Sequence, residues 1–83
     1  MSKKEKLIAR VLSVPKDFTY DELRTLLHYY GYEEDAGGNG SRVSFYNEET
    51  NSVIKLHKPH PGNIVKPYVI ELVIVKLREA NLI

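Results

Sequence analysis

Two histidines and a lysine lie close together in the segment LHKPHPG. His57 and His60 are three positions apart, and Lys58 lies between them. Histidine titrates near neutral pH, so two histidines can supply a base and an acid while lysine supplies a positive charge. Beside an RNA phosphodiester, such groups suffice for metal-free cleavage, with a base for the 2′-hydroxyl and an acid for the leaving 5′-oxygen. A loop without any chemistry is the competing explanation, and the simpler one.

The remaining sequence offers few other groups for such chemistry. His28 is the third histidine, and it falls within the predicted helical segment LRTLLHYYGY. Cysteine is absent, which excludes disulfides, thiolate nucleophiles and thiolate metal ligands. A metal site at the histidine pair would need a third ligand, and the sequence suggests none nearby. We therefore expect no metal and no other cofactor.

A glycine-rich stretch, GGNGSR, precedes a strand-like run. A phosphate-binding loop of the NTPase type needs a lysine after its glycines and then a helix, and a dinucleotide-binding loop also needs a helix. Neither follows here, so Gly37, Gly38 and Gly40 are expected to close a hairpin with positive φ angles. Arg42, at its edge, stays protonated and can grip a phosphate, but it cannot act as a general base.

Charge is unevenly distributed along the 83 residues, although the net charge is only +1. Residues 1–16 carry five cations against one acid, residues 17–50 carry two against eight, and residues 51–83 carry five against two. A polyanion would be attracted to the two ends and repelled by the middle. Ordinary solvated surface charge is the competing explanation.

Hydrophobic periodicity predicts the elements that must position these residues. The spacing predicts one helix over residues 3–12 and a second from Thr19, where Glu22 completes a capping box, to a stop at Gly31. Three short strands are then expected in YEEDA, RVSFY and SVIKLH, joined as an antiparallel meander.

The final segment, about residues 66–80, is ambiguous because Val and Ile favour strands. Pro67 suits a first helical turn, and Ile70, Val73, Ile74 and Leu77 repeat with helical spacing, so we predict a helix. Its second apolar stripe includes Val69, Leu72 and Val73. Either the N-terminal helix or a protein partner is expected to cover this stripe.

Length and composition predict one domain over residues 1–83, with residues 1–16 as a helical extension of a core at 17–83. The N-terminal segment does not resemble a signal peptide, and no apolar run is long enough to span a membrane. We expect a cytoplasmic protein.

The order of short motifs resembles the HicA toxins, the small mRNA-cleaving partners of HicB-type antitoxins. The matching residues are Leu26-Leu27 with Gly31-Tyr32, Gly40-Ser41 before a strand containing Phe45, Pro59-His60 with Gly62, and the closing helix. The resemblance covers about residues 19–83. The family's usual motif is Gly-Ser-His, whose histidine is taken as catalytic, whereas this chain has Arg42 at that position.

The resemblance implies an α+β fold like that of double-stranded-RNA-binding domains, α-β-β-β-α, with a three-stranded antiparallel sheet and helices on one face. It also implies that mRNA is bound and cleaved, and that an antitoxin is the partner. Such a fold binds RNA through phosphate and 2′-hydroxyl contacts. The expected site residues are His60 and His57 for catalysis and, for RNA phosphates, Gly40, Ser41, Arg42, Lys55, Lys58 and Lys66.

Two other readings remain open at this point. The fold could carry a non-catalytic RNA- or protein-binding module, in which Arg42 replaces the lost acid–base group. The acidic middle and the near-neutral net charge instead suit a protein-interaction module that binds no nucleic acid. A homodimer is a further alternative.

Overall fold

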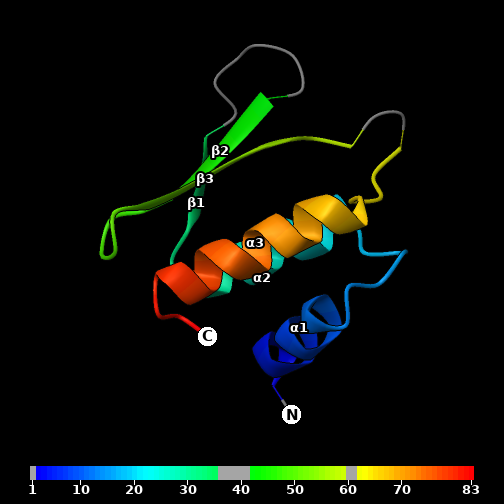
Figure 1. The fold of residues 1–83 in the computed structure, drawn as a ribbon, viewed down its shortest axis with the longest axis horizontal. Coiled ribbons are helices and arrows are strands. Elements are labelled where there is room, and N and C mark those ends of the chain that lie inside the picture. The colour runs from blue at the N-terminus through cyan, green and yellow to red at the C-terminus, as the bar shows by residue number, and fades with distance from the viewer. Residues whose placement is uncertain (1, 36–41, 60–61) are drawn as a thin grey trace.

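The computed structural model describes residues 2–35, 42–59 and 62–83. The elements follow in the order α1 (Lys3–Leu12), α2 (Tyr20–Tyr29), β1 (Glu33–Asp35), β2 (Arg42–Asn47), β3 (Ser52–His57) and α3 (Pro67–Glu79). The strands form one antiparallel sheet in the order β1-β2-β3, and α2 and α3 lie on the same side of it (Figure 1). The α+β class and element order predicted from the sequence are confirmed.

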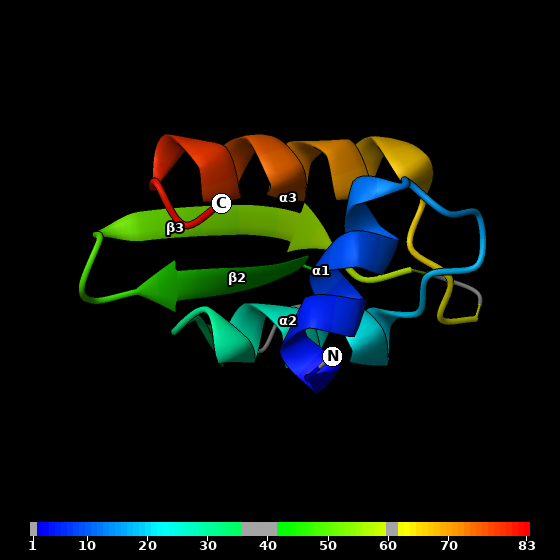
Figure 2. The same cartoon turned by 90° about the horizontal axis from the view of Figure 1, so that it is seen from below.

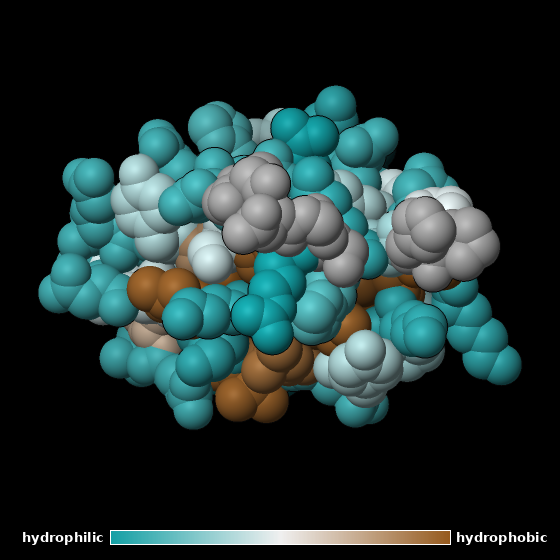
Figure 3. All heavy atoms as spheres, turned by 90° about the horizontal axis from the view of Figure 1, so that it is seen from above, coloured by the Kyte–Doolittle hydropathy of each residue, from teal (hydrophilic) through white to brown (hydrophobic). Residues whose placement is uncertain are grey.

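The elements stack in three layers. Helix α2 packs beneath β1 and α3 beneath β3, while α1 contacts both helices from the side away from the sheet (Figures 1 and 2). Val43 and Phe45 of β2 and Ile54 and Leu56 of β3 are buried against the helices. The alternate residues of these strands lie on the other face, which is largely hydrophilic (Figure 3).

Helix α2 begins and ends where the sequence predicts. The Thr19 hydroxyl accepts a hydrogen bond from the Glu22 N–H, and the Glu22 carboxylate accepts one from the Thr19 N–H. At the other end Gly31 has φ +89°, and a Cβ there would lie 3.1 Å from the Asn47 side-chain nitrogen. That nitrogen donates to the Tyr30 carbonyl at 2.9 Å. Glycine therefore lets the helix stop against the end of β2.

Helix α3 has Pro67 in its first turn and buries one face, formed by Val69, Ile70, Val73 and Leu77. The predicted helix is confirmed, although Ile74 is only half-buried. Of the second stripe, Val69 and Val73 are buried, and Leu72 remains 37% exposed. None of the helices in the described residues, α3 included, is long and apolar enough to cross a membrane.

Candidate functional site

The hydrophilic face of the sheet brings together residues from the ends of two strands. Arg42, the first residue of β2, lies directly opposite His57, the last residue of β3. Two positions along, Ser44 lies opposite Lys55. Because side chains alternate between the two faces of a strand, these four residues share the face that points away from the helices.

Two adjoining hollows meet at His57. The strand hollow has a volume of about 330 Å³ and is lined by Arg42, Val43, Ser44, Lys55, Leu56 and His57. The helix hollow has a volume of about 280 Å³ and is lined by His57, Lys58, Pro59, Val65, Lys66, Tyr68 and Val69. We call Arg42, Lys55, His57, Lys58 and Lys66 the basic cluster. The residues that line the two hollows, all of them within the described chain, include no carboxylate.

The cations of the basic cluster have no carboxylate partner among residues 2–35, 42–59 and 62–83. Other arginines do: Arg10 pairs with Glu22 at 2.9 Å and Asp17 at 3.1 Å, and Arg24 pairs with Glu34 at 3.3 Å. Guanidinium and ammonium groups without a carboxylate partner can donate hydrogen bonds to phosphate oxygens without first breaking an ion pair. The arrangement is therefore suited to an anionic ligand.

The aromatic ring of Tyr20 lies close to the Lys58 ammonium group. The Lys58 ammonium lies 5.7 Å from the centre of the Tyr20 ring, within the range of a cation–π contact. The Tyr20 hydroxyl donates a hydrogen bond to Glu34, and the ring packs against Phe45 with centroids 6.4 Å apart. Burial, and then the hydrogen bond to Glu34, raise the pKa of Tyr20 well above its ordinary value, so the hydroxyl remains a donor.

The segment of residues 62–65, which precedes Lys66 of the basic cluster, is hydrogen-bonded to the start of α2. Gly62 has φ +85°, a left-handed conformation that glycine adopts without strain. The Tyr20 N–H then donates to the Asn63 carbonyl at 2.7 Å, and the Val65 N–H donates to the Phe18 carbonyl at 2.8 Å. Helix α3 therefore starts beside the basic cluster.

Three of the predicted site residues, Gly40, Ser41 and His60, lie outside the described residues, as do Gly37 and Gly38 of the predicted hairpin turn. Ser41 directly precedes Arg42, and His60 follows His57 by three positions. The five other predicted residues, Arg42, Lys55, His57, Lys58 and Lys66, all line one or both of the two hollows.

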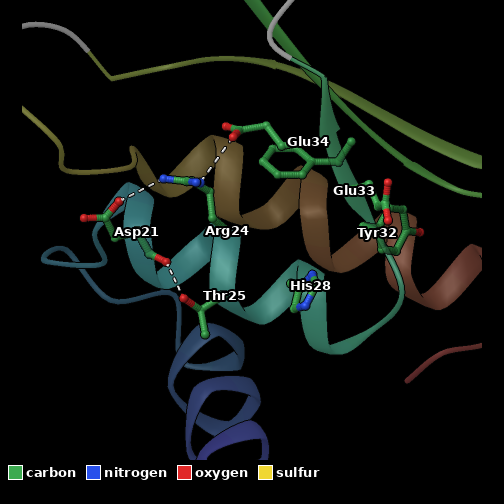
Figure 4. Close-up of a pocket in the computed structure, with 8 residues that line it drawn as sticks. Asp21, Arg24, Thr25, His28, Tyr32, Glu33 and Glu34 are labelled. Carbon is green, nitrogen blue, oxygen red and sulfur yellow. Dashed lines mark hydrogen bonds and ion pairs between the residues drawn. The ribbon is translucent and has the colours of Figure 1, made fainter.

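A larger hollow, of about 580 Å³, lies between α2 and β1 (Figure 4). We call it the acidic hollow, and it is lined by Asp21, Arg24, Thr25, His28, Tyr32, Glu33, Glu34 and Phe45. The Arg24 guanidinium forms ion pairs with Asp21 at 3.5 Å and with Glu34 at 3.3 Å. Its positive charge is therefore neutralised by carboxylates of the protein. His28 lines this hollow and not those of the basic cluster.

Sequence reasoning missed two aromatic residues at the site, Tyr20 and Tyr68. Tyr20 has the spacing of an apolar helical stripe with Leu23 and Leu27, and nothing in the sequence places it near Lys58. Tyr68 had a usable signal, because it directly follows Lys66-Pro67 at the start of a helix.

Within the described chain, no three His, Cys, Asp or Glu side chains lie close enough together to hold a metal ion.

Comparison with known proteins assigns the chain to a family. Residues 20–82 match the family model of the HicA toxin of bacterial toxin–antitoxin systems. The match includes α2, the sheet, the basic cluster and α3, and begins after α1. No curated protein and no solved structure matches the chain significantly. Since the family model covers well over half of the sequence, the chain belongs to the HicA toxin family.

Proposed function

We propose that this HicA toxin binds mRNA at the basic cluster and cleaves it, and that a HicB-like antitoxin neutralises it. The observation that carries the proposal is the pairing of Arg42 with His57 among cations that have no carboxylate partner in the described chain. The sheet face is exposed and hydrophilic, so an RNA backbone can reach these groups. Family membership supports the toxin role and the antitoxin partner.

The proposed reaction needs no metal. One histidine acts as the base and takes the proton of the ribose 2′-hydroxyl, whose oxygen attacks the adjacent phosphorus. The bond from phosphorus to the 5′-oxygen breaks, which leaves a cyclic 2′,3′-phosphate, and a second group acts as the acid that protonates the 5′-oxygen. His60 is our first candidate for proton transfer and His57 the second. Arg42 cannot exchange protons near neutral pH, so its role is to hold the phosphate and stabilise its developing charge.

Expression in bacteria and cleavage of a defined RNA by the purified protein test the proposal. We expect growth arrest and cleavage by the wild-type chain, both abolished by His60→Ala. Arg42→His restores the family motif and should raise the cleavage rate. If the wild-type chain and Arg42→His are both inactive, the enzymatic proposal is wrong.

A second candidate, a non-catalytic RNA- or protein-binding module, is favoured by one observation: Arg42 occupies the position of the family's motif histidine. This candidate predicts salt-dependent RNA binding without cleavage.

The exposed residues of α3, such as Leu72, offer a surface for the antitoxin or for a second copy of the chain. Sedimentation of the chain alone and with the antitoxin separates these two occupants. Since mRNA is the proposed substrate, we place the protein in the cytoplasm.

A further inference from the structure

Tyr68 is the most exposed large apolar side chain among those described, with 65% of its surface accessible. It lies in the first turn of α3, one residue after Pro67. Proline fixes the backbone there, and the Val65 N–H bond to Phe18 fastens the preceding segment. Tyr68 is therefore an exposed ring on a rigid support.

The surroundings of Tyr68 are cationic. It lines the helix hollow together with Lys58, Lys66 and His57, and no lining residue there carries a carboxylate. The volume of about 280 Å³ lies just below the roughly 300 Å³ at which pockets for whole small molecules begin. A hollow of this size, open beside an exposed ring, suits a single planar group.

A nucleobase of a single strand has the matching chemistry. Single-stranded nucleic acids bind where cationic side chains contact the phosphates and aromatic rings stack on the bases. Unpaired bases are also the part of RNA that proteins read most readily, because a duplex hides its base faces. The helix hollow offers both kinds of contact within a few residues of His57.

We propose that Tyr68 is a base-stacking platform, on which one unpaired base of an RNA strand lies while Lys58 and Lys66 contact the phosphates beside it. The inference rests on the proposed function, which it extends by naming a residue that binds an unpaired base of the RNA. Tyr68 acts in binding and takes no part in proton transfer.

A protein partner is the competing occupant, because Leu72 and Val75 continue the exposed stripe along α3, at 37% and 50% exposure. The cations around Tyr68 favour RNA over a protein partner as the occupant. Tyr68 adjoins the cations of the helix hollow, whereas an apolar protein contact would be expected to centre on the stripe and away from charges that have no carboxylate partner in the described chain. Loss of self-association in a Tyr68 variant would indicate a protein contact instead.

Fluorescence gives a direct test, because the chain contains no tryptophan. Tyr68→Trp introduces one fluorophore at the proposed platform, and Tyr29→Trp introduces one at the end of α2, 42% exposed and outside the basic cluster. Each variant is titrated with a single-stranded RNA oligonucleotide and with an abasic strand of the same length, and melting curves establish that each is folded. We expect the oligonucleotide to quench Tyr68→Trp and not Tyr29→Trp, and the abasic strand to quench neither.

Affinity measurements complete the test. Tyr68→Ala should weaken binding of the oligonucleotide about 5- to 150-fold and leave the salt dependence unchanged, since no charge is removed, while Tyr68→Phe should bind like wild type. If the wild-type chain binds RNA but Tyr68→Ala binds equally well and no quenching occurs, the inference is wrong and the proposed function stands. If the wild-type chain binds no RNA even at low salt, the proposed function fails, and the inference with it.

Discussion

The acidic hollow between α2 and β1 and the two hollows at His57 differ in how their charges are used. The acidic hollow is larger than either of the other two, at about 580 Å³, and contains an arginine and a histidine. Its arginine is bound between Asp21 and Glu34. Around His57 the hollows are smaller, yet their cations have no carboxylate partner in the described chain. Available charge, and not volume, identifies the surface suited to a phosphate backbone.

The same contrast applies to the sheet as a whole. At the far end of the face, Tyr46 lies opposite Glu33, and the Glu33 carboxylate is the main cause of a raised pKa for the Tyr46 hydroxyl. Strand β1 places acidic residues beside β2 from Tyr46 to Ser44, whereas Arg42 and His57 lie beyond the residues that pair with β1. An RNA strand on this face would be drawn toward the Arg42–His57 end.

The largest expected effect comes from replacing the three histidines of the chain by alanine, one at a time. His60→Ala should lower the RNA cleavage rate about 10²- to 10⁴-fold, the usual contribution of a positioned proton-transfer group. His28→Ala, in the acidic hollow, is the matched control and should leave the rate unchanged. A loss of activity in His28→Ala, with His57→Ala and His60→Ala fully active, would reverse the assignment of the two regions.

Removing two cations should weaken RNA binding less drastically but in a diagnostic way. Each cation that neutralises a phosphate of a single strand adds about 0.7 to the slope of log K against log salt, so Arg42→Ala combined with Lys58→Ala should lower that slope by about 1.4. Asp21→Asn combined with Glu33→Gln changes the acidic hollow by the same number of charges. Filter binding across a salt series should give this control a slope no lower than that of the wild-type chain. Equal slopes for the wild-type chain and both double variants would mean that Arg42 and Lys58 do not bind phosphates.

Variants of Tyr20 test whether its ring positions Lys58, because they leave the charge of Lys58 in place. Tyr20→Phe keeps the ring under Lys58 and removes the hydroxyl, so we expect a loss of about 1 kcal/mol in unfolding free energy and unchanged RNA affinity. Tyr20→Leu also removes the ring, and should weaken RNA binding a few-fold because it removes a cation–π interaction of about 0.5–1 kcal/mol. Chemical denaturation and RNA titration measure the two effects, and an equal RNA affinity of both variants would show that Tyr20 does not position Lys58.

The smallest effect concerns a paired arginine. Hydrogen bonding to Arg10 is the main cause of a lowered pKa for Glu22, so the pair stabilises the fold above the ordinary pKa of a glutamate, and this contribution disappears as the pH falls through the lowered value. Glu22→Gln preserves the capping geometry and removes the charge. The wild-type chain should exceed this variant in unfolding free energy by about 0.2–1 kcal/mol at pH 7, and the difference should vanish well below pH 4.5. A difference that persists in acid would mean that the ion pair is not its source.

Much of the fold could be predicted because its signals are local. The capping box at Thr19, the stop at Gly31 and the proline of α3 each mark an element end through contacts within a few residues. The register that sets Arg42 opposite His57 could not be predicted in this way. It depends on the β2–β3 turn, where the buried Asn47 side chain accepts the N–H groups of Glu49 and Thr50 and also bonds to the end of α2.

The residue types at the site could be predicted from the sequence, but their arrangement could be predicted only in part. Cations near a histidine pair suggested phosphate chemistry, and the structure brings Arg42, Lys55, His57, Lys58 and Lys66 into adjoining hollows. The roles of these residues remain predictions. Tyr20 and Tyr68 escaped prediction because periodicity indicates that an aromatic residue lies on a helix, but not whether its ring faces a neighbouring lysine or solvent.

The most direct test of the central claim is a nuclear magnetic resonance titration of the ¹⁵N-labelled chain with a short single-stranded RNA that resists cleavage. We predict that the largest amide shift changes lie at Arg42, Ser44, Lys55, His57 and Lys58, with smaller changes at Lys66 and Tyr68, and that the changes diminish as salt is added. Amides of Thr25, His28 and Glu33, in the acidic hollow, should barely move. Changes centred on the acidic hollow, or none at low salt, would contradict RNA binding at the basic cluster.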